Sequence, residues 1–240
     1  MKNMKSKLMA VVSLLIITVL LATSQVSAIT NVVTPEFVDH QGEATSFDPA
    51  YVEFSAEETI LGAHSVKMYI PEGAIPSPPP EVWNLGLNAE VRLATGMSRS
   101  RGLVLYNDVS FKAKMVDVYG GQLPYVSLIL YDRTHDVWVS MVSYDGQTTL
   151  GGDGWYTITV PSSANWWGWT FGGGYYGPVD GSGNPAPCPL SGWDKWIATN
   201  HFDVDVRKVN IQFGYYAYGL WGTVYVDGLS FAGRILDFEP

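Results

Sequence analysis

Apolar and polar residues alternate with a period of two along most of this chain. Over residues 110–118, Phe111, Ala113 and Met115 share one side while Lys112 and Lys114 share the other, which is typical of a half-buried β-strand. Good helical periodicity is found only in the apolar N-terminal segment. Similar alternation predicts strands over 51–55, 65–70, 87–93, 125–131, 137–144, 155–160, 209–217 and 223–231. With glycine-rich turns between them, these strands predict an all-β fold, an antiparallel β-sandwich.

Residues 1–28 have the layout of a secretory signal peptide. Three lysines precede an apolar run over residues 8–22, and Ala28 ends a small-residue cleavage site. The apolar run is shorter than the ~20 residues that a membrane-spanning helix needs. We therefore expect the segment to be removed and the mature protein to be secreted, extracellular or at the cell surface, with no membrane span.

The rest of the chain is expected to form an extended arm, residues 29–45, and a single domain, residues 46–240. Pro35 limits a strand in the arm to a sheet edge or a strand start, so the arm pairs either with its own sheet or with a neighbour's. Cys188 is the only cysteine, which excludes an internal disulfide and leaves a free thiol or an intermolecular bridge.

The charge of the mature chain argues against nucleic acid as a partner. Three of the 14 basic residues lie in the signal segment, so the remainder, against 23 acidic residues, leaves a formal charge of −12. Binding to phosphates needs a basic surface. We therefore expect no nucleic-acid partner.

Residues 162–201 show no convincing strand or helix pattern, yet they contain five of the nine tryptophans. Loops of this length are uncommon in compact domains and are usually functional or disordered, and disordered segments are poor in aromatic residues. Adjacent residues of an extended segment point in opposite directions, so at least one of Trp166, Trp167 and Trp169 is expected at the surface. We therefore predict that the segment forms an aromatic surface that stacks on a ligand. Residues 165–189 are the part of the segment where we expect this surface.

Other candidate ligand-binding side chains lie on strands, on the side away from the core. If Val126, Leu128 and Leu130 face the core, Tyr125 and Tyr131 face outward, and the same alternation applies to the later strands. Flat rings beside hydrogen-bonding groups suit pyranose sugars, which have apolar faces and many hydroxyls. The predicted ligand-binding residues are Trp166, Trp167, Trp169, Tyr175, Tyr176, Tyr125, Trp138 and Gln212.

Several motifs occur in an order that points to a known family. They include Gly62-Ala-His-Ser-Val-Lys-Met68, Gly154-Trp-Tyr-Thr-Ile-Thr-Val160, and residues 209–215 followed by Gly222-Thr-Val-Tyr-Val-Asp-Gly-Leu229. Together they resemble the calcium-binding, galactose-binding-like jelly roll of carbohydrate-binding modules, over about residues 47–231. The resemblance implies a jelly roll with carbohydrate as its partner, in which Trp193 and Trp196 belong to a crossover that packs on the sandwich.

The same resemblance implies a structural calcium ion (Ca2+) near Asp48 and Asp227. The family places acidic ligands there beside backbone carbonyls, and calcium takes six to eight oxygen ligands. Pro49 and Gly228 stand where many relatives have further polar or acidic residues. The alternative is that Asp48 caps a turn and Asp227 is solvated.

The sequence is compatible with three functions. The first is a secreted, non-catalytic protein that binds polysaccharide or surface glycan through aromatic loops. The second is a structural subunit of a cell-surface filament or coat, which self-associates when the arm 29–45 adds a strand to a neighbour's sheet.

The third function, a polysaccharide lyase or glycoside hydrolase, would need paired carboxyl groups. Asp203 with Asp205 and Asp132 with Asp136 are the candidate pairs. The four histidines form no recognisable metal spacing, and the sequence has no nucleophile elbow or Cys–His arrangement. We therefore expect no catalytic residues.

Overall fold

The computed structural model of the chain describes residues 29–33, 43–46, 51–72, 88–97, 108–120, 123–214, 221–231 and 234–239. The predicted signal segment and Asp48 lie outside the described residues.

The described strands form two sheets. The first contains β1 (Ile29–Val33), β3 (Tyr51–Ser55), β4 (Ser65–Ile70), β6 (Val109–Tyr119), β9 (Gln147–Leu150), β10 (Tyr156–Val160), β13 (Trp221–Phe231) and β14 (Arg234–Phe238). The second contains β2 (Glu43–Ser46), β5 (Asn88–Met97), β7 (Tyr125–Asp132), β8 (Val137–Val142), β11 (Trp167–Thr170) and β12 (Val204–Gly214).

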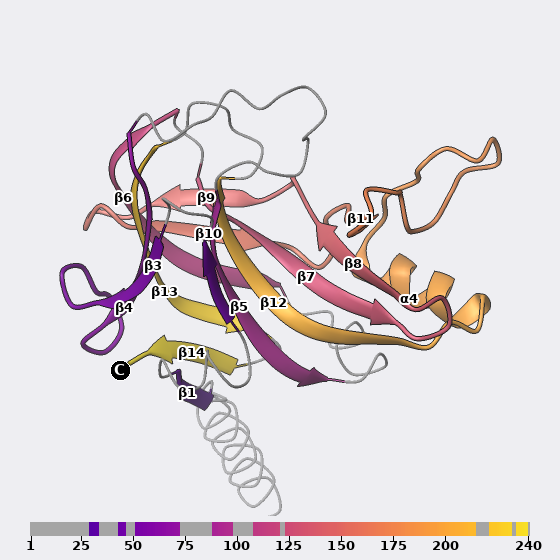
Figure 1. Cartoon of the computed structure of the whole chain (residues 1–240), viewed down its shortest axis with the longest axis horizontal. Helices are drawn as coiled ribbons and strands as arrows, with labels where there is room; N and C mark the ends of the chain where they lie inside the picture. Colours follow the sequence, from indigo (N-terminus) through magenta and orange to yellow (C-terminus); the bar gives the residue numbers. More distant parts are fainter. Residues whose placement is uncertain are drawn as a thin grey trace, which may run out of the picture.

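The order of the strands confirms the predicted antiparallel β-sandwich of the jelly-roll class (Figure 1). The first sheet runs β1-β14-β13-β6-β10-β9, with β4 also paired to β13 and β3 to β4, and the second runs β11-β8-β7-β12-β5-β2. Among the described pairs, only β1 with β14 is parallel. Both strands of the arm, β1 and β2, therefore pair within their own chain, at the outer edges of the two sheets.

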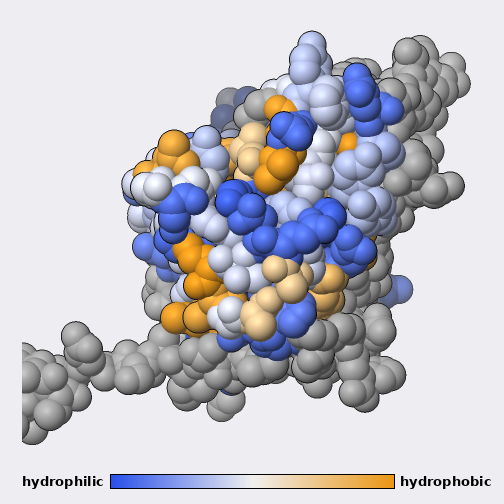
Figure 2. Space-filling model, turned by 90° about the vertical axis from the view of Figure 1, so that its left-hand side faces the viewer, coloured by the Kyte–Doolittle hydropathy of each residue, from blue (hydrophilic) through white to orange (hydrophobic). Residues whose placement is uncertain are grey.

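The hydrophobic core lies between the sheets, where the period-two alternation places its apolar side chains. Phe111 and Ala113 of β6 are buried, whereas Lys112 and Lys114 on the other side are partly exposed. Each fully buried large apolar side chain contributes roughly 1.5–3 kcal/mol. The outer face of the first sheet carries ion pairs, such as Lys67 with Glu57, and the side of the molecule that bears the β3–β4 loop shows a band of hydrophilic side chains (Figure 2).

One predicted strand starts earlier than expected. Strand β12 begins at Val204, five residues before the predicted start at 209, and its register shifts between Val206 and Lys208. A β-bulge inserts an extra residue and interrupts the alternation, so the pattern that begins at Val209 does not continue through Arg207 and Lys208 back to Val204. Strands β9 and β14 were not predicted either, because apolar and polar residues do not alternate along them.

The prediction that residues 162–201 contain no regular structure is wrong. They contain strand β11 and the helix α4 (Leu190–Thr199), whose buried residues Leu190, Trp193 and Ile197 are spaced at three and four positions. With ten residues and Gly192 in its first turn, α4 is too short to stand out by periodicity. Trp193 is fully buried, as predicted. In the described part of the chain, no helix has the length and apolar content needed to cross a membrane.

Gly168 in β11 is required because Trp193 and the backbone of Tyr176 approach it closely. A Cβ atom at this position would lie 2.2 Å from the Tyr176 carbonyl oxygen and 2.5 Å from Cη2 of Trp193. We expect Gly168→Ala to lower the free energy of unfolding by about 1–3 kcal/mol, the usual range for overpacking, as measured by urea denaturation. The control is Gly181→Ala, where a Cβ atom meets nothing within 4 Å; equal stability of the two variants would contradict this packing.

Candidate functional site

Strand β11 presents a row of aromatic rings on the face of the sheet that points away from the core. Gly168 faces Trp193 in the core, so Trp167 and Trp169 lie on the opposite side of the strand. Phe171 continues the row, because its N–H donates to the Trp138 carbonyl oxygen at 3.0 Å and extends the pairing of β11 with β8. The rings of Trp167 and Trp169 are parallel within 3°, with centroids 6.5 Å apart.

The aromatic row continues across the sheet onto β8 and β7. The Trp138 ring lies 6.4 Å from that of Phe171 and 5.0 Å from that of Tyr131. Trp138 is 41% exposed and Phe171 is 55% exposed, and the other three rings are partly exposed. We call Tyr131, Trp138, Trp167, Trp169 and Phe171 the aromatic platform.

Charged and polar groups lie at the Tyr131 end of the aromatic platform. The Arg207 guanidinium lies over the Tyr131 ring, 5.6 Å from its centroid, and pairs with Asp205 at 3.0 Å. The Tyr131 hydroxyl donates to Asp136 at 2.5 Å, and this hydrogen bond raises the pKa of the Tyr131 hydroxyl. On β8, Ser140 is paired with Trp169 and is partly exposed. The platform thus has hydroxyl, carboxylate and guanidinium groups beside its rings.

The segment after β11 folds back along the outer edge of that strand. Tyr176 N–H donates to the Gly168 carbonyl oxygen at 2.9 Å, and Trp166 N–H donates to the Cys188 carbonyl oxygen at 3.0 Å. Because an unpaired strand edge can recruit another chain, this return covers the free edge of β11. Residues 171–189 then extend outward on the side of the molecule where α4 lies (Figure 1).

Two of the predicted ligand-binding residues are buried, and the prediction that they face a ligand is wrong. Trp166 is 0% exposed and belongs to the core, since it precedes the outward-facing Trp167. Gln212 is only 9% exposed and accepts a hydrogen bond from Ser127 Oγ at 3.3 Å. Alternation placed Gln212 on the face of the second sheet that points away from the sandwich core. Alternation does not reveal which parts of the chain cover that face.

The remaining predicted residues divide into rings of the platform and rings beside it. Trp138, Trp167 and Trp169 belong to the aromatic platform. Tyr175 packs edge-on against Trp169 at 5.7 Å, and Tyr125 is partly buried. Tyr176 points the other way, onto Trp193 and Trp196. Tyr131 and Phe171 complete the platform although they were not among the predicted ligand residues; the spacing of Trp167, Trp169 and Phe171 at every second position was the available signal.

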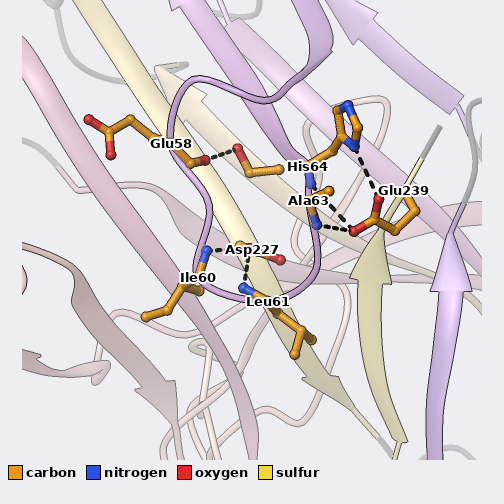
Figure 3. Close-up of polar contacts among 8 residues, drawn as sticks. Glu58, Ile60, Leu61, Ala63, His64, Asp227 and Glu239 are labelled. Carbon is orange, nitrogen blue, oxygen red and sulfur yellow. Dashed lines mark hydrogen bonds and ion pairs between the residues drawn. The ribbon is translucent and has the colours of Figure 1, made fainter.

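Asp227 binds the loop between β3 and β4 (Figure 3). Its buried carboxylate accepts hydrogen bonds from the N–H groups of Ile60 and Leu61, at 3.0 and 2.9 Å, and from the N–H of Gly228 at 2.7 Å. Burial raises the pKa of the Asp227 carboxyl, and these hydrogen bonds offset part of that effect. Asp227 is therefore not solvated. It accepts hydrogen bonds from backbone N–H groups that lie 166 and 167 residues earlier in the chain.

Glu239 binds the other half of the same loop (Figure 3). Its carboxylate accepts hydrogen bonds from the N–H groups of Ala63 and His64 and lies 3.0 Å from Nδ1 of His64. These hydrogen bonds lower the pKa of the Glu239 carboxyl, with the Ala63 N–H as the largest cause. The two carboxylates together hold the β3–β4 loop against β13 and the C-terminal end of the described chain.

Backbone groups already engage the Asp227 carboxylate, and the calcium ion expected beside it stays a prediction. Both carboxylate oxygens accept backbone N–H groups, and a calcium ion would have to share the oxygens with these donors. Among the described residues, no three His, Cys, Asp or Glu side chains form a group that could hold a metal ion. The role of Asp48 stays a prediction, because that residue lies outside the described part.

The four candidate catalytic carboxylates each have partners within the protein. Asp205 pairs with Arg133 at 2.5 Å and with Arg207, and Asp203 lies 3.4 Å from Arg133. Asp136 accepts the Tyr131 hydroxyl. Asp132 is buried, and burial is the largest single effect on its pKa, which it raises. Hydrogen bonds from His135, Tyr176 and Thr134 together outweigh burial, so the pKa of the Asp132 carboxyl lies below its ordinary value.

Comparison with known proteins identifies no family for this chain. No protein-family model matches the chain, and no curated protein does. A solved structure that matches is the C-terminal family 22 carbohydrate binding module of Clostridium thermocellum Xyn10B, with 16% sequence identity over 84% of this chain and 92% of that one. The TM-score of 0.28 describes a loose superposition, and the β-sandwich is established by the sheets of the chain itself.

We expect Asp227→Asn to destabilise the protein equally with and without calcium. The substitution replaces one acceptor oxygen by an N–H₂ donor that faces backbone donors, which costs about 1–3 kcal/mol of unfolding free energy. The measurement is urea unfolding in calcium and in EDTA. The control is Glu53→Gln, because Glu53 is an exposed carboxylate on the same sheet that lies 3.6 Å from Lys67. A wild-type protein that loses several kcal/mol in EDTA, while Asp227→Asn does not respond to EDTA, would show a calcium site at Asp227.

We expect the contribution of Glu239 to stability to depend on pH. Because its folded-state pKa lies below the ordinary value, the stabilisation is present above the unfolded-state pKa of about 4.3 and is lost as the pH falls through the folded-state pKa. The difference in unfolding free energy between wild type and Glu239→Gln should therefore shrink between pH 6 and pH 3. A difference that stays constant over this range would contradict the role of the Glu239 carboxylate.

Proposed function

We propose that this chain is an exported, non-catalytic protein that binds polysaccharide or surface glycan on the aromatic platform. The observation that supports the proposal is the row of partly exposed rings on the outer face of β11, β8 and β7, with Trp138 and Phe171 the most exposed. Soluble proteins rarely expose large apolar surfaces without a binding role. Export is inferred from the N-terminal segment of the sequence.

The chemistry of the aromatic platform suits carbohydrate. Aromatic rings offer apolar faces for the CH-rich faces of pyranose rings, at about 25 cal/mol per Å² of apolar surface removed from water. Sugar hydroxyls need donors and acceptors at the rim, and Ser140, Asp136 and the Arg207–Asp205 pair lie there. The platform lies on an outer sheet face, which favours binding of an extended chain.

The carboxylates support a non-catalytic role. A general acid that cleaves glycosidic bonds needs a raised pKa, whereas the pKa of Asp132 is lowered. Asp205 is held between two arginines. Carboxylates occupied by such partners favour binding over cleavage.

The filament or coat subunit is not favoured by a specific observation. That function required the arm 29–45 to add a strand to a neighbouring molecule, but β1 and β2 pair with β14 and β5 of the same chain. The carbohydrate-binding function is therefore the one that we propose.

We expect the mature protein to bind at least one insoluble or soluble polysaccharide in a panel of plant, fungal and bacterial glycans. Trp138→Ala and Trp169→Ala should each weaken that binding about tenfold or more, which corresponds to about 1.4 kcal/mol, because each removes one stacking ring. The measurement is the dissociation constant, by affinity electrophoresis or calorimetry.

Tyr119→Ala is the matched control for these two substitutions. Tyr119 is an exposed ring, 63% accessible, on the other sheet, where it stacks on Trp221. Its loss should leave the dissociation constant unchanged. Equal weakening by Tyr119→Ala and Trp138→Ala would place the binding site elsewhere, and a wild-type protein that binds no glycan would contradict the proposed function.

A further inference from the structure

Asp132, at the end of β7, is a fully buried carboxylate that lies outside the aromatic platform. Its Oδ2 accepts hydrogen bonds from the Tyr176 hydroxyl at 2.7 Å and from Nδ1 of His135 at 2.5 Å, and its Oδ1 accepts the N–H of Thr134 at 2.8 Å. Burying an ionised group is costly unless such partners are present. All of these donors come from two segments, the β7–β8 turn and the loop after β11.

Tyr176 connects this carboxylate to strand β11. Its hydroxyl donates to Asp132, and its backbone N–H donates to the carbonyl oxygen of Gly168 at 2.9 Å. Its ring packs on Trp193 with a centroid distance of 6.3 Å and on Trp196 at 5.3 Å. Gly168 lies between Trp167 and Trp169, so Tyr176 contacts the backbone on which both platform rings are carried.

Besides the contact of Gly168 with Trp193, strand β11 is held by β8 on one side and by the returning segment on the other. It has four residues, it is the outermost strand of its sheet, and β8 is the neighbouring strand. Short strands at sheet edges open locally at low free-energy cost. A contact that fixes the outer side of β11 therefore has a large effect on where the Trp167 and Trp169 rings lie.

We propose that Asp132 is a positioning residue for the aromatic platform: through the Tyr176 hydroxyl it holds β11, and with it Trp167 and Trp169, in the orientation that binds ligand. The effect on ligand rests on the proposed function, whereas the effect on β11 does not. The β7–β8 turn provides a second link to the platform, because it also carries Asp136, which accepts the hydroxyl of Tyr131.

The variants that test this role are Tyr176→Phe, Asp132→Asn and the double variant. Tyr176→Phe removes only the hydroxyl and leaves the ring on Trp193, so this variant is expected to fold even if Asp132→Asn does not. Each single variant should raise the dissociation constant for the polysaccharide that wild type binds by about tenfold. The double variant should bind polysaccharide no more weakly than the single variant with the higher dissociation constant, because the two groups share one interaction.

Hydrogen exchange provides a readout that does not require a ligand. Backbone amides of residues 167–171 should exchange at least tenfold faster in Tyr176→Phe, while amides of the central strand β12 keep their wild-type rates. The control is Asp180→Asn, an acid in the same loop whose carboxylate accepts N–H groups of Ser182 and Asn184 at the loop tip. Asp180→Asn should change neither the exchange of residues 167–171 nor the dissociation constant.

Two results would overturn the positioning role. One is unchanged exchange of residues 167–171 in Tyr176→Phe, and the other is an equal acceleration in β12, which would show a general loss of stability. If wild type binds no polysaccharide, the proposed function fails, but faster exchange confined to residues 167–171 still supports the positioning of β11. If the platform variants lose binding while Tyr176→Phe keeps both wild-type affinity and wild-type exchange, only the positioning role fails.

Discussion

The close contact between Trp193 of α4 and Gly168 of β11 is the interaction on which the aromatic half of this molecule depends. The indole lies where a side chain at position 168 would be, and its Nε1–H donates to the Trp166 carbonyl oxygen at 2.9 Å. This contact fixes one side of β11 toward the core. Because side chains alternate along a strand, Trp167 and Trp169 must then point outward, and the exposed platform follows from a buried tryptophan.

Period-two alternation predicted the sandwich well, because strands such as β4, β6 and β10 bury one face against the other sheet and leave the other partly exposed. Alternation gave a wrong prediction where another effect decided the structure. The bulge between Val206 and Lys208 separated the start of β12 from the alternation that follows it, and α4 was too short to show a helical period. In the site, alternation separated Trp166 from its neighbours, but the burial of Gln212 depends on tertiary covering that no local pattern encodes.

Carboxylates organise the loops of this acidic chain. Asp227 and Glu239 accept backbone N–H groups of the β3–β4 loop, and Asp132 joins the β7–β8 turn to the loop after β11. Loops of a sandwich have backbone groups that the sheets cannot satisfy, and an ionised carboxylate is a strong acceptor for them. The sequence indicated Asp227 as a candidate metal ligand and Asp132 as a candidate catalytic acid, and it did not single out Glu239, because the partners of a carboxylate are not visible in a sequence.

The tip of the loop after β11 is bonded mainly to itself. Asp180 accepts the N–H groups of Ser182 and Asn184, and a Cβ atom at Gly181 or Gly183 would meet no neighbouring atom. The tip is therefore independent of the contacts that hold β11 and α4 in place. Apart from Asp180 and Gly183, whose φ is positive, substitutions there are expected to cost folding little, so the reach of this loop can vary beside an unchanged aromatic platform.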